Sequence, residues 1–220
     1  ELFRNAAVTD RTWEALSEQY DVYNLIDAVM TVAETTSTAV LFNALGIQPD
    51  PDKNVTAPIP STSVPYRVVA PAREPALTAA RIEPVEGDGL RVSRTFLRHP
   101  DMAEARATNP GYVMNPDRSR LVPHDRELLI LRTGWNAQAA YEWAKHVGSV
   151  GRARDHGLEP LWIAQGKDAR GWNEIERALI DAADEMYRDA TISDGTWAML
   201  SERYDTHQMM SIAGTAARYR

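Results

Sequence analysis

The feature that most constrains this chain is an internal repeat. The segment VTDRTWEALSEQYD, residues 8–21, resembles ISDGTWAMLSERYD, residues 192–205, at an offset of 184 residues (192 − 8). Each copy opens with a Thr-Asp or Ser-Asp pair, which is typical of a helix N-terminus, and then places Trp, Leu and Tyr at helical spacing. The repeat predicts one helical unit used twice. Its four large aromatic residues are predicted to pack in the core: Trp13, Tyr20, Trp197 and Tyr204.

Each copy runs into a second apolar helix. After the first copy, the segment LIDAVMTVAETTSTAVLFNALGIQPD predicts an amphipathic helix of about five turns that ends near Gly46. The second copy stops at Arg220, and residues 1–7, ELFRNAA, have the pattern of the tail of a helix. We therefore expect a segment of a longer tandem protein, or a permuted domain.

The rest of the chain divides into a proline-rich part and a helical part. Residues 49–86 hold eight of the thirteen prolines, which predicts an extended linker. From Gly89 onward the apolar residues recur with helical spacing, and sustained period-two alternation is absent. The predicted fold class is all-α.

Composition excludes several classes of protein. The formal net charge is −7, and no run of Lys or Arg stands out, which argues against nucleic-acid binding. The longest apolar stretch, residues 28–45, is interrupted by Glu34 and by Thr and Ser, so no membrane span is predicted. The absence of cysteine excludes disulfides, thiol nucleophiles and thiolate metal sites, and it is compatible with a cytoplasmic location.

The segment AAYEWAKHV, residues 139–147, places Glu142 and His146 one helical turn apart. Residues four apart share a helix face, and a neighbouring carboxylate favours the imidazolium form, so this pair can act as a proton donor. The alternative is a solvent-exposed charged pair worth a few tenths of a kcal/mol. Spacing alone favours that alternative. Tyr141 and Trp143 flank the pair, and they either line a pocket or pack against a neighbouring subunit.

A second glutamate, Glu127, can join the pair only if the helix breaks. One continuous helix over residues 125–156 would separate Glu127 from Glu142 by about 22 Å. Gly134 and Asn136 predict the break, because Gly weakens a helix and Asn is a favoured N-cap.

The break predicts two antiparallel helices that bring Glu127 back towards His146. The second helix is predicted to run from Ala137 to about His156, with Gly157 as its C-terminal cap. A metal site is not favoured, because two ligands on one helix need a third and no H-E-x-x-H pattern occurs. His99 and His124 are predicted to be helix caps or surface groups.

The segment RELLILRTGWNAQAAYEWAKHVGSVGRARDHGL resembles the carboxymuconolactone decarboxylase family, which includes the alkyl hydroperoxidase D-like proteins. Four other segments resemble the family in its own order: RVSRTFLRHPDM, GYVMNP, ALIDAADEM and ISDGTWAMLSERYD. The resemblance covers about residues 80–220, and residues 1–50 resemble the C-terminal end of the same domain. It implies an alkyl hydroperoxidase D-like helical bundle. It also implies a partial first domain over residues 1–48, a linker over 49–86 and a full domain over 87–220.

The family's peroxidase branch uses two cysteines that this chain lacks. Aligned on His146, the branch's glutamate falls at Glu127 and its cysteines at Ala139 and Glu142, while Tyr141 stands where another histidine is frequent. Disulfide-linked peroxide reduction is therefore excluded. The decarboxylase branch carries a Glu-x-x-x-His pair on this helix, and Glu142 with His146 matches that pattern. The resemblance favours a functional pair.

The resemblance implies a cofactor-free enzyme that acts on a small carboxylated or lactone-type substrate. His146 is expected to transfer a proton at the carbon that loses carboxylate, Glu142 to orient and charge it, and Glu127 to complete the relay. Tyr141 is a candidate hydrogen-bond donor to an enolate. The candidate substrate-binding residues are Arg132, Arg94 and Trp143.

The alternative from another class is a non-catalytic helical oligomerisation module that has lost this chemistry. In an enzyme, Glu142 and His146 should line a cavity. In an oligomerisation module, they should be covered by other side chains or be fully solvated. The family resemblance implies a homo-oligomer, a dimer, trimer or hexamer, with a small-molecule substrate and neither nucleic acid nor membrane as partners. We also expect the helix over residues 22–45 to pack against the helix that bears Glu142 and His146, from its own or a neighbouring chain.

The missing cysteines give a direct test. Because no thiol is available to cycle between dithiol and disulfide, the protein should not reduce peroxide with dithiol donors. A coupled peroxide-consumption assay with a heat-killed control measures this. Thiol-dependent peroxide reduction above that control would overturn the assignment to the decarboxylase branch.

Overall fold

The computed structural model describes residues 1–47, 80–101, 103–104, 111–115, 118–148 and 151–220. Within these ranges every regular element is a helix, so the predicted all-α class is confirmed. The first helices are α1 (Leu2–Asn5), α2 (Asp10–Ser17), α3 (Val22–Ala44) and α4 (Arg91–Phe96). The later ones are α6 (Pro123–Asn136), α7 (Ala140–Val147), the 3₁₀ helix η2 (Ala153–His156), α8 (Pro160–Gln165), α9 (Glu174–Asp189), α10 (Asp194–Ser201) and α11 (Thr206–Tyr219).

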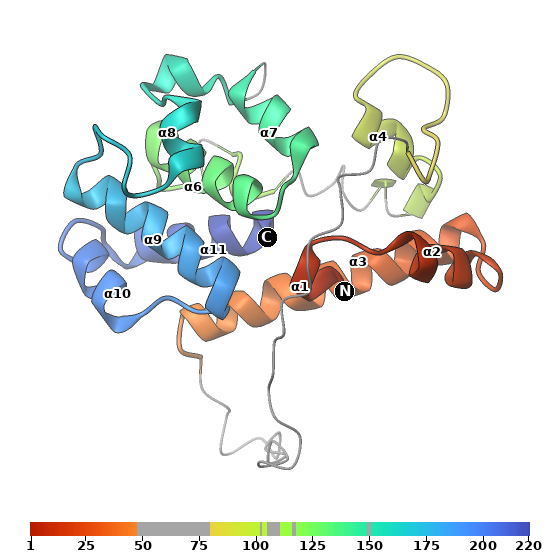
Figure 1. Cartoon of the computed structure of the whole chain (residues 1–220), viewed down its shortest axis with the longest axis horizontal. Helices are drawn as coiled ribbons and strands as arrows, with labels where there is room; N and C mark the ends of the chain where they lie inside the picture. The colour runs from red at the N-terminus through yellow and green to blue at the C-terminus, as the bar shows by residue number, and fades with distance from the viewer. Residues whose placement is uncertain (48–79, 102, 105–110, 116–117, 149–150) are drawn as a thin grey trace, which may run out of the picture.

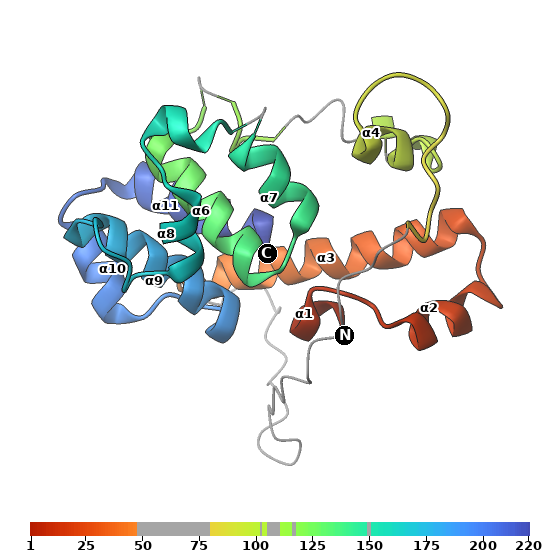
Figure 2. The same ribbon diagram turned by 45° about the horizontal axis from the view of Figure 1, so that its top comes forward.

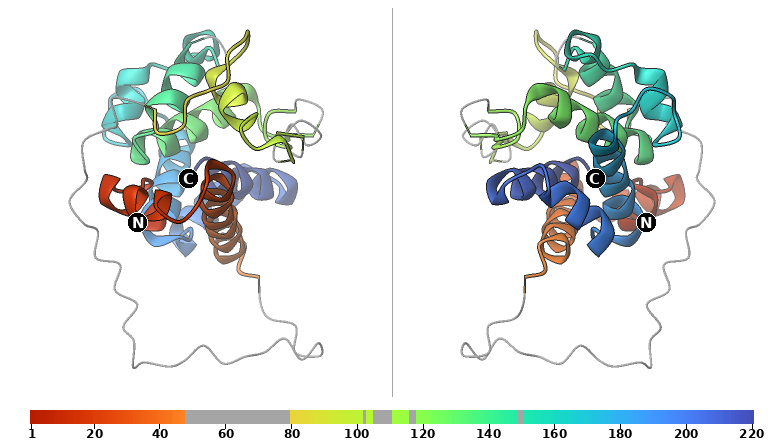
Figure 3. Two further views of the ribbon diagram at one scale, coloured as in Figure 1. Left: turned by 90° about the vertical axis from the view of Figure 1, so that its right-hand side faces the viewer. Right: turned by 90° about the vertical axis from the view of Figure 1, so that its left-hand side faces the viewer.

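The helices gather in two groups joined by α3. Helices α6 to α11 form the larger group, whereas α1, α2 and α4 lie around the other end of α3 (Figure 1). The tilted view keeps the same arrangement, with α3 running past both groups (Figure 2). Viewed along its length, α3 lies below the larger group (Figure 3). The C-terminal end of α11 comes close to α7, which matters for the candidate site.

Helix α6 is the centre of the larger group. It packs against α7, η2, α8, α9 and α11. Four consecutive residues, Leu128 to Leu131, are each at most 1 % exposed, and a helix that is apolar all round must be surrounded by other elements. Pro123 occupies the first turn, where its missing N–H leaves no intrahelical bond unmade. A polar side chain on α6 next to Leu128–Leu131 is therefore held away from water.

The repeat is reproduced in the structure, and it reaches back to residue 1. The N-caps Thr9 and Ser193 each accept a hydrogen bond from the amide three residues later. Glu1 accepts from the Thr9 amide at 3.0 Å, and Glu185 accepts from the Ser193 amide at 2.8 Å. Glu1 and Glu185 are separated by the same 184 residues (185 − 1) as the two capping residues (193 − 9).

The backbone ahead of each cap is equivalent as well. Ala6 follows α1 with a φ of 53°, and Ala190 follows α9 with a φ of 59°. Left-handed residues of this kind close helices, although alanine is an uncommon choice for them. Helix α1 therefore corresponds to the last turn of α9, as expected for a helix tail.

The two copies differ in how deeply they are buried. Tyr204 is 6 % exposed and donates a hydrogen bond from its hydroxyl to Asp125 on α6, at 2.8 Å. Tyr20 is 50 % exposed, so the prediction that it packs in the core is wrong. Trp13 and Trp197 are both partly buried. The sequence pattern is shared, but α10 packs against α9, whereas α2 packs against α3.

Helix α3 is long and only partly covered. Val40 and Ala44 lie in the main core beside α11, and α11 rather than α7 is the chief partner of α3 within the chain, so the expected packing against α7 of its own chain is wrong. The reason is that α11 takes the place beside α6 and α3 then lies on α11. Packing against α7 of a neighbouring chain stays a prediction. Val32 and Phe42 are 42 % and 47 % exposed. By length and composition alone, α3 could cross a membrane, contrary to the expectation from sequence.

Only the end of the predicted linker can be described, since residues 49–79 lie outside the described ranges. Within residues 80–86, Arg81 contacts the first copy. Arg81 donates to the Val8 carbonyl at 2.6 Å, forms an ion pair with Asp10, and lies over the Trp13 ring. Arg81 therefore ties the end of the predicted linker to α2.

The break after α6 is confirmed, but the helix that follows is shorter than predicted. Helix α7 ends at Val147, and the chain turns before η2 begins at Ala153. Gly157 follows η2 with a φ of 78°, as predicted for a C-terminal cap. Asn136 does not cap α7, because its amide donates to Asp184 at 2.7 Å, and Ala139 stands at the N-cap without a side-chain bond.

The position of α3 gives a matched test of packing. Val40→Ala should lower the free energy of unfolding by about 1–3 kcal/mol, because a fully buried valine loses its apolar burial. Val32→Ala, eight residues earlier on the same helix, should change it by less than about 0.5 kcal/mol. Denaturant unfolding measures both. Equal effects would show that α3 does not pack on α11 as described.

Candidate functional site

A buried contact between a glutamate and a histidine links α6 to α7. Glu127 is fully buried on α6, and its Oε2 lies 2.7 Å from Nδ1 of His146, which is 3 % exposed on α7. The antiparallel return of the chain after Asn136 brings the two helices together, as predicted from the break. His146 is not part of a solvent-exposed charged pair, because α11 and the backbone at Gly151 cover it.

The Glu127 contact fixes which nitrogen of the imidazole is available. A carboxylate only accepts, so Nδ1 carries the proton and donates it, and Nε2 is left as the nitrogen able to exchange a proton. Glu142 Oε2 lies 3.6 Å from Nε2, too far for a hydrogen bond, and the Glu142 side chain is 42 % exposed. Glu127 therefore orients the His146 ring through Nδ1. Glu142 lies on the opposite side of the ring, near Nε2.

A single cation lies next to the buried carboxylate. The Arg126 Nε lies 3.4 Å from Glu127 Oε1, and the Arg126 side chain is 11 % exposed. His146 and Arg126 thus approach different oxygens of one carboxylate. Burying an unpaired carboxylate is costly, so these two contacts compensate for the lost hydration of Glu127.

Gly151 leaves room for the ion pair. A Cβ at this position would lie 2.2 Å from Glu127 Oε2 and 2.5 Å from the His146 carbonyl oxygen. Real carbon atoms do not approach oxygen this closely, so any larger residue must displace the pair. The backbone at Gly151 therefore passes directly over the Glu127 carboxylate.

Tyr219, near the end of α11, completes the surroundings of the imidazole. Its ring meets the His146 ring edge-on, with the centroids 5.3 Å apart and the planes at 90°. Burial raises the pKa of Tyr219 to about 12, and the carboxylates of Glu142 and Glu127 add to the shift. The hydroxyl therefore stays protonated at neutral pH.

The two aromatic residues flanking the pair in sequence lie differently from each other. Tyr141 is 39 % exposed on α7. Trp143 is partly buried against the core, and its ring lies 5.2 Å from the ring of Trp135 on α6. Trp143 thus helps to fix α7 on α6, while Tyr141 stays accessible next to Glu142 in sequence.

The predicted arginines do not join the pair. Arg132 forms a two-point contact with Asp184 at 2.6 and 2.8 Å, and its remaining nitrogen donates to the carbonyls of Ile163 and Ala164. These bonds tie α6 to α9 and α8 and use all three nitrogens of the guanidinium. Arg94 donates to the Val85 carbonyl from α4, which lies apart from α7 (Figure 1).

Two other histidines also bond to carboxylates, which differs from their predicted role as caps or surface groups. His99 is 4 % exposed, with Nε2 2.9 Å from Asp27 and its ring stacked on Tyr23. His124 bridges the His156 carbonyl at 2.7 Å and Glu176 at 2.8 Å. Within the described ranges, no three His, Cys, Asp or Glu side chains are grouped so that they could hold a metal ion.

Two open clefts lie away from the ion pair. One, of about 550 Å³, lies at the N-terminal ends of α6 and α9 and includes His124, Asp125 and Tyr204. The other, of about 430 Å³, lies between α9 and α10. Neither includes Glu142 or His146 among its lining residues. The two clefts therefore do not supply the cavity expected around the pair in an enzyme.

The arrangement is suited to proton transfer. A histidine held by a buried carboxylate is fixed in one tautomer, and the carboxylate stabilises the imidazolium that forms when Nε2 takes a proton. A protonated phenol lies against the ring, and a guanidinium lies beside the carboxylate that holds it. The sequence did not identify Gly151, Tyr219 or Arg126. The glycines after His146 were a usable signal for the first, but nothing local pointed to Tyr219.

Gly151 allows a specific test of the ion pair. Gly151→Ala should destabilise the fold by about 1–3 kcal/mol and displace the His146 ring, because the added methyl overlaps Glu127 Oε2. Gly195→Ala is the matched control, since its Cβ would meet nothing within 4 Å. Thermal unfolding and the NMR signals of the His146 ring measure both effects. An unchanged His146 signal in Gly151→Ala would contradict the geometry.

Comparison of the chain with family models, with curated proteins and with solved structures gives no significant match. The resemblance to the carboxymuconolactone decarboxylase family therefore stays a prediction from sequence motifs. The candidate site has to be interpreted from its own geometry.

Proposed function

We propose that this chain is a cofactor-free enzyme of the carboxymuconolactone decarboxylase type, which uses His146 for acid-base chemistry on a small carboxylated or lactone-type substrate. One observation supports the proposal above the others. His146 is bonded through Nδ1 to a fully buried carboxylate, while Nε2 has no hydrogen bond in the described part of the chain. A histidine with only a structural role would be expected to use both nitrogens.

The proposed step is decarboxylation followed by protonation. The bond between the carboxylate and its carbon breaks, its electron pair stays on the carbon as an enolate, and carbon dioxide leaves. Protonated His146 then gives its Nε2 proton to that carbon, and the neutral imidazole is reprotonated from solvent. Glu127 holds the ring and stabilises its positive charge, and Glu142 lies beside Nε2. Tyr141 and Tyr219 are candidate donors to the enolate oxygen.

The resemblance and the geometry support this proposal independently. The motif alignment selects Glu127, Glu142 and His146 from sequence alone, and those three side chains lie together in the structure. Their closeness is notable because Glu127 and His146 are 19 residues apart and lie on different helices.

The second candidate, a helical oligomerisation module, is favoured by two observations. His146 is covered, and neither cleft includes it or Glu142. The apolar helix α3 leaves Val22, Val32 and Phe42 more than 40 % exposed. Apolar side chains gathered on one long helix are typical of a surface that meets another protein. This proposal does not account for a buried ion pair with one ring nitrogen left unbonded.

Proton transfer by His146 can be tested without the natural substrate. The wild type should catalyse exchange of deuterium from D₂O into the carbon next to the carbonyl of levulinate, a small keto acid, as followed by proton NMR. His146→Gln and Glu127→Gln should each lower this rate by about 10²–10⁴-fold, since general acid-base catalysis is lost or misaligned. Glu142→Gln should have a smaller effect, because Glu142 makes no hydrogen bond to the ring.

His207→Gln, an exposed histidine on α11, is the matched control and should keep the wild-type rate. His146→Gln is also expected to lower stability, because it leaves the buried Glu127 with a weaker partner. Rates are therefore compared at a temperature where each variant is folded by circular dichroism. Wild-type exchange no faster than that of His146→Gln would contradict the proposed function.

A further inference from the structure

Arg126 keeps most of its donors unpaired although it is largely buried. A guanidinium carries five N–H groups, and the one on Nε faces Glu127 Oε1 at the long distance of 3.4 Å. The two terminal nitrogens make no hydrogen bond in the described part of the chain. They are also not among its fully buried unpaired atoms, so they keep some exposure to solvent. Arg132, in contrast, has its nitrogens committed to α8 and α9.

Tyr219 presents a second unpaired donor in the same place. Its hydroxyl has no hydrogen-bond partner among the described residues, and its ring lies against His146. The groups whose charges act on this hydroxyl are Glu142, Glu127, Arg218 and Arg126. Tyr219 therefore lies against the His146 ring, and Arg126 lies against the carboxylate that holds the same ring.

We propose that Arg126 and Tyr219 form a carboxylate-binding subsite beside His146, with the Arg126 terminal nitrogens as the bidentate contact and the Tyr219 hydroxyl as the second donor. The inference rests on the proposed function, because it names the residues that hold the substrate of that same site. It replaces Arg132 and Arg94, which the sequence suggested for this role.

The chemistry of the subsite selects a single negative charge on a planar group. A guanidinium fork matches the two oxygens of a carboxylate, and a protonated phenol adds a third donor. Arg126 already lies beside Glu127, and Glu142 is close to the imidazole, so a group with two negative charges would be repelled. A monoanionic carboxylate therefore fits better than a phosphate.

The test is a titration with levulinate followed through the ring signals of ¹⁵N-labelled histidine. The His146 signals of the wild type should shift and saturate with levulinate, and they should not shift with γ-valerolactone, which has the same carbon skeleton without the charge. Arg126→Gln should weaken levulinate binding by about tenfold or more, and Tyr219→Phe by roughly two- to fivefold. Arg188→Gln is the matched control.

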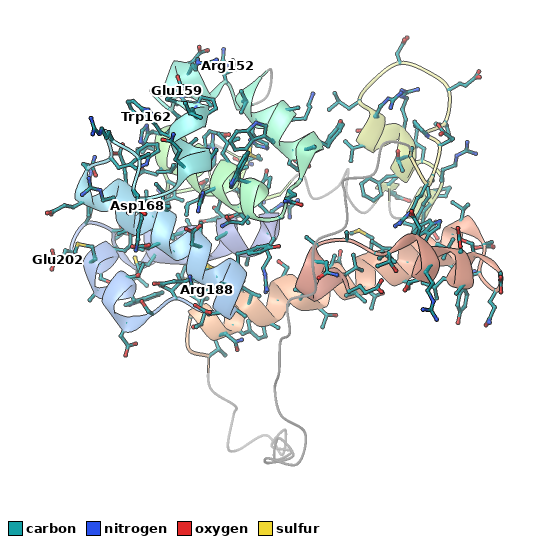
Figure 4. All side chains as sticks on the ribbon, in the orientation of Figure 1. Arg152, Glu159, Trp162, Asp168, Arg188 and Glu202 are labelled. Carbon is teal, nitrogen blue, oxygen red and sulfur yellow. The ribbon has the colours of Figure 1, made fainter. Side chains whose placement is uncertain are left out.

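Arg188 lies at the end of α9 near α3, away from α7, and it pairs with Asp189 (Figure 4). Its variant should bind levulinate as the wild type does. The unperturbed signals of His99 and His124 report that each variant is folded. If Arg126→Gln does not fold, Tyr219→Phe decides the outcome alone.

Several results would overturn the subsite. These are wild-type levulinate binding that is absent, binding unchanged in both Arg126→Gln and Tyr219→Phe, equal binding of γ-valerolactone, or displacement of levulinate by an equal concentration of inorganic phosphate. Failure of the proposed function looks different: levulinate would still bind through Arg126, while deuterium exchange would not depend on His146.

Discussion

The buried carboxylate of Glu127 is the interaction on which the candidate site depends. It lies on α6, a helix surrounded by other helices, and it has no access to water. A charge in that position has to be matched by the protein, and the structure supplies His146 on one oxygen and Arg126 on the other. The close turn at Gly151 and the packing of Tyr219 against the imidazole follow from this arrangement.

The internal repeat explains how the surrounding helices are placed. A capping unit made of a glutamate, a left-handed alanine and a Thr or Ser N-cap occurs at both ends of the described chain. In the second copy this unit fixes α10 on α9, and α11 can then cover α6 and bring Tyr219 to His146. In the first copy the same unit leads into α3, whose far end rests on α11. The same local pattern therefore precedes α11, which contributes Tyr219 to the candidate site, and α3, which connects the two groups of helices.

The sequence predicted the local features of this molecule better than it predicted the contacts between residues far apart in the chain. The caps of the two repeat copies, the break between α6 and α7, and the approach of Glu127 to His146 were predicted, because each follows from spacing and from local preferences near a helix end. The Asn136 cap was wrong, because its amide bonds to Asp184. The length of α7 was wrong, since the chain leaves the helix to pass over Glu127 at Gly151. Arg132 was assigned to substrate because its partner Asp184 lies far along the sequence. Burial of His146 and the contact with Tyr219 depend on how α11 packs, which no local pattern encodes.

The most direct test of this account is the tautomer of His146. The ¹⁵N NMR spectrum of the histidine rings at neutral pH should show His146 with its proton on Nδ1, and that proton should resonate far downfield and exchange slowly, because Nδ1 donates to a buried carboxylate. Glu127→Gln should remove the downfield proton while α6 remains folded. A neutral His146 with its proton on Nε2, or a ring that exchanges freely with solvent, would contradict the central role given to the Glu127 contact.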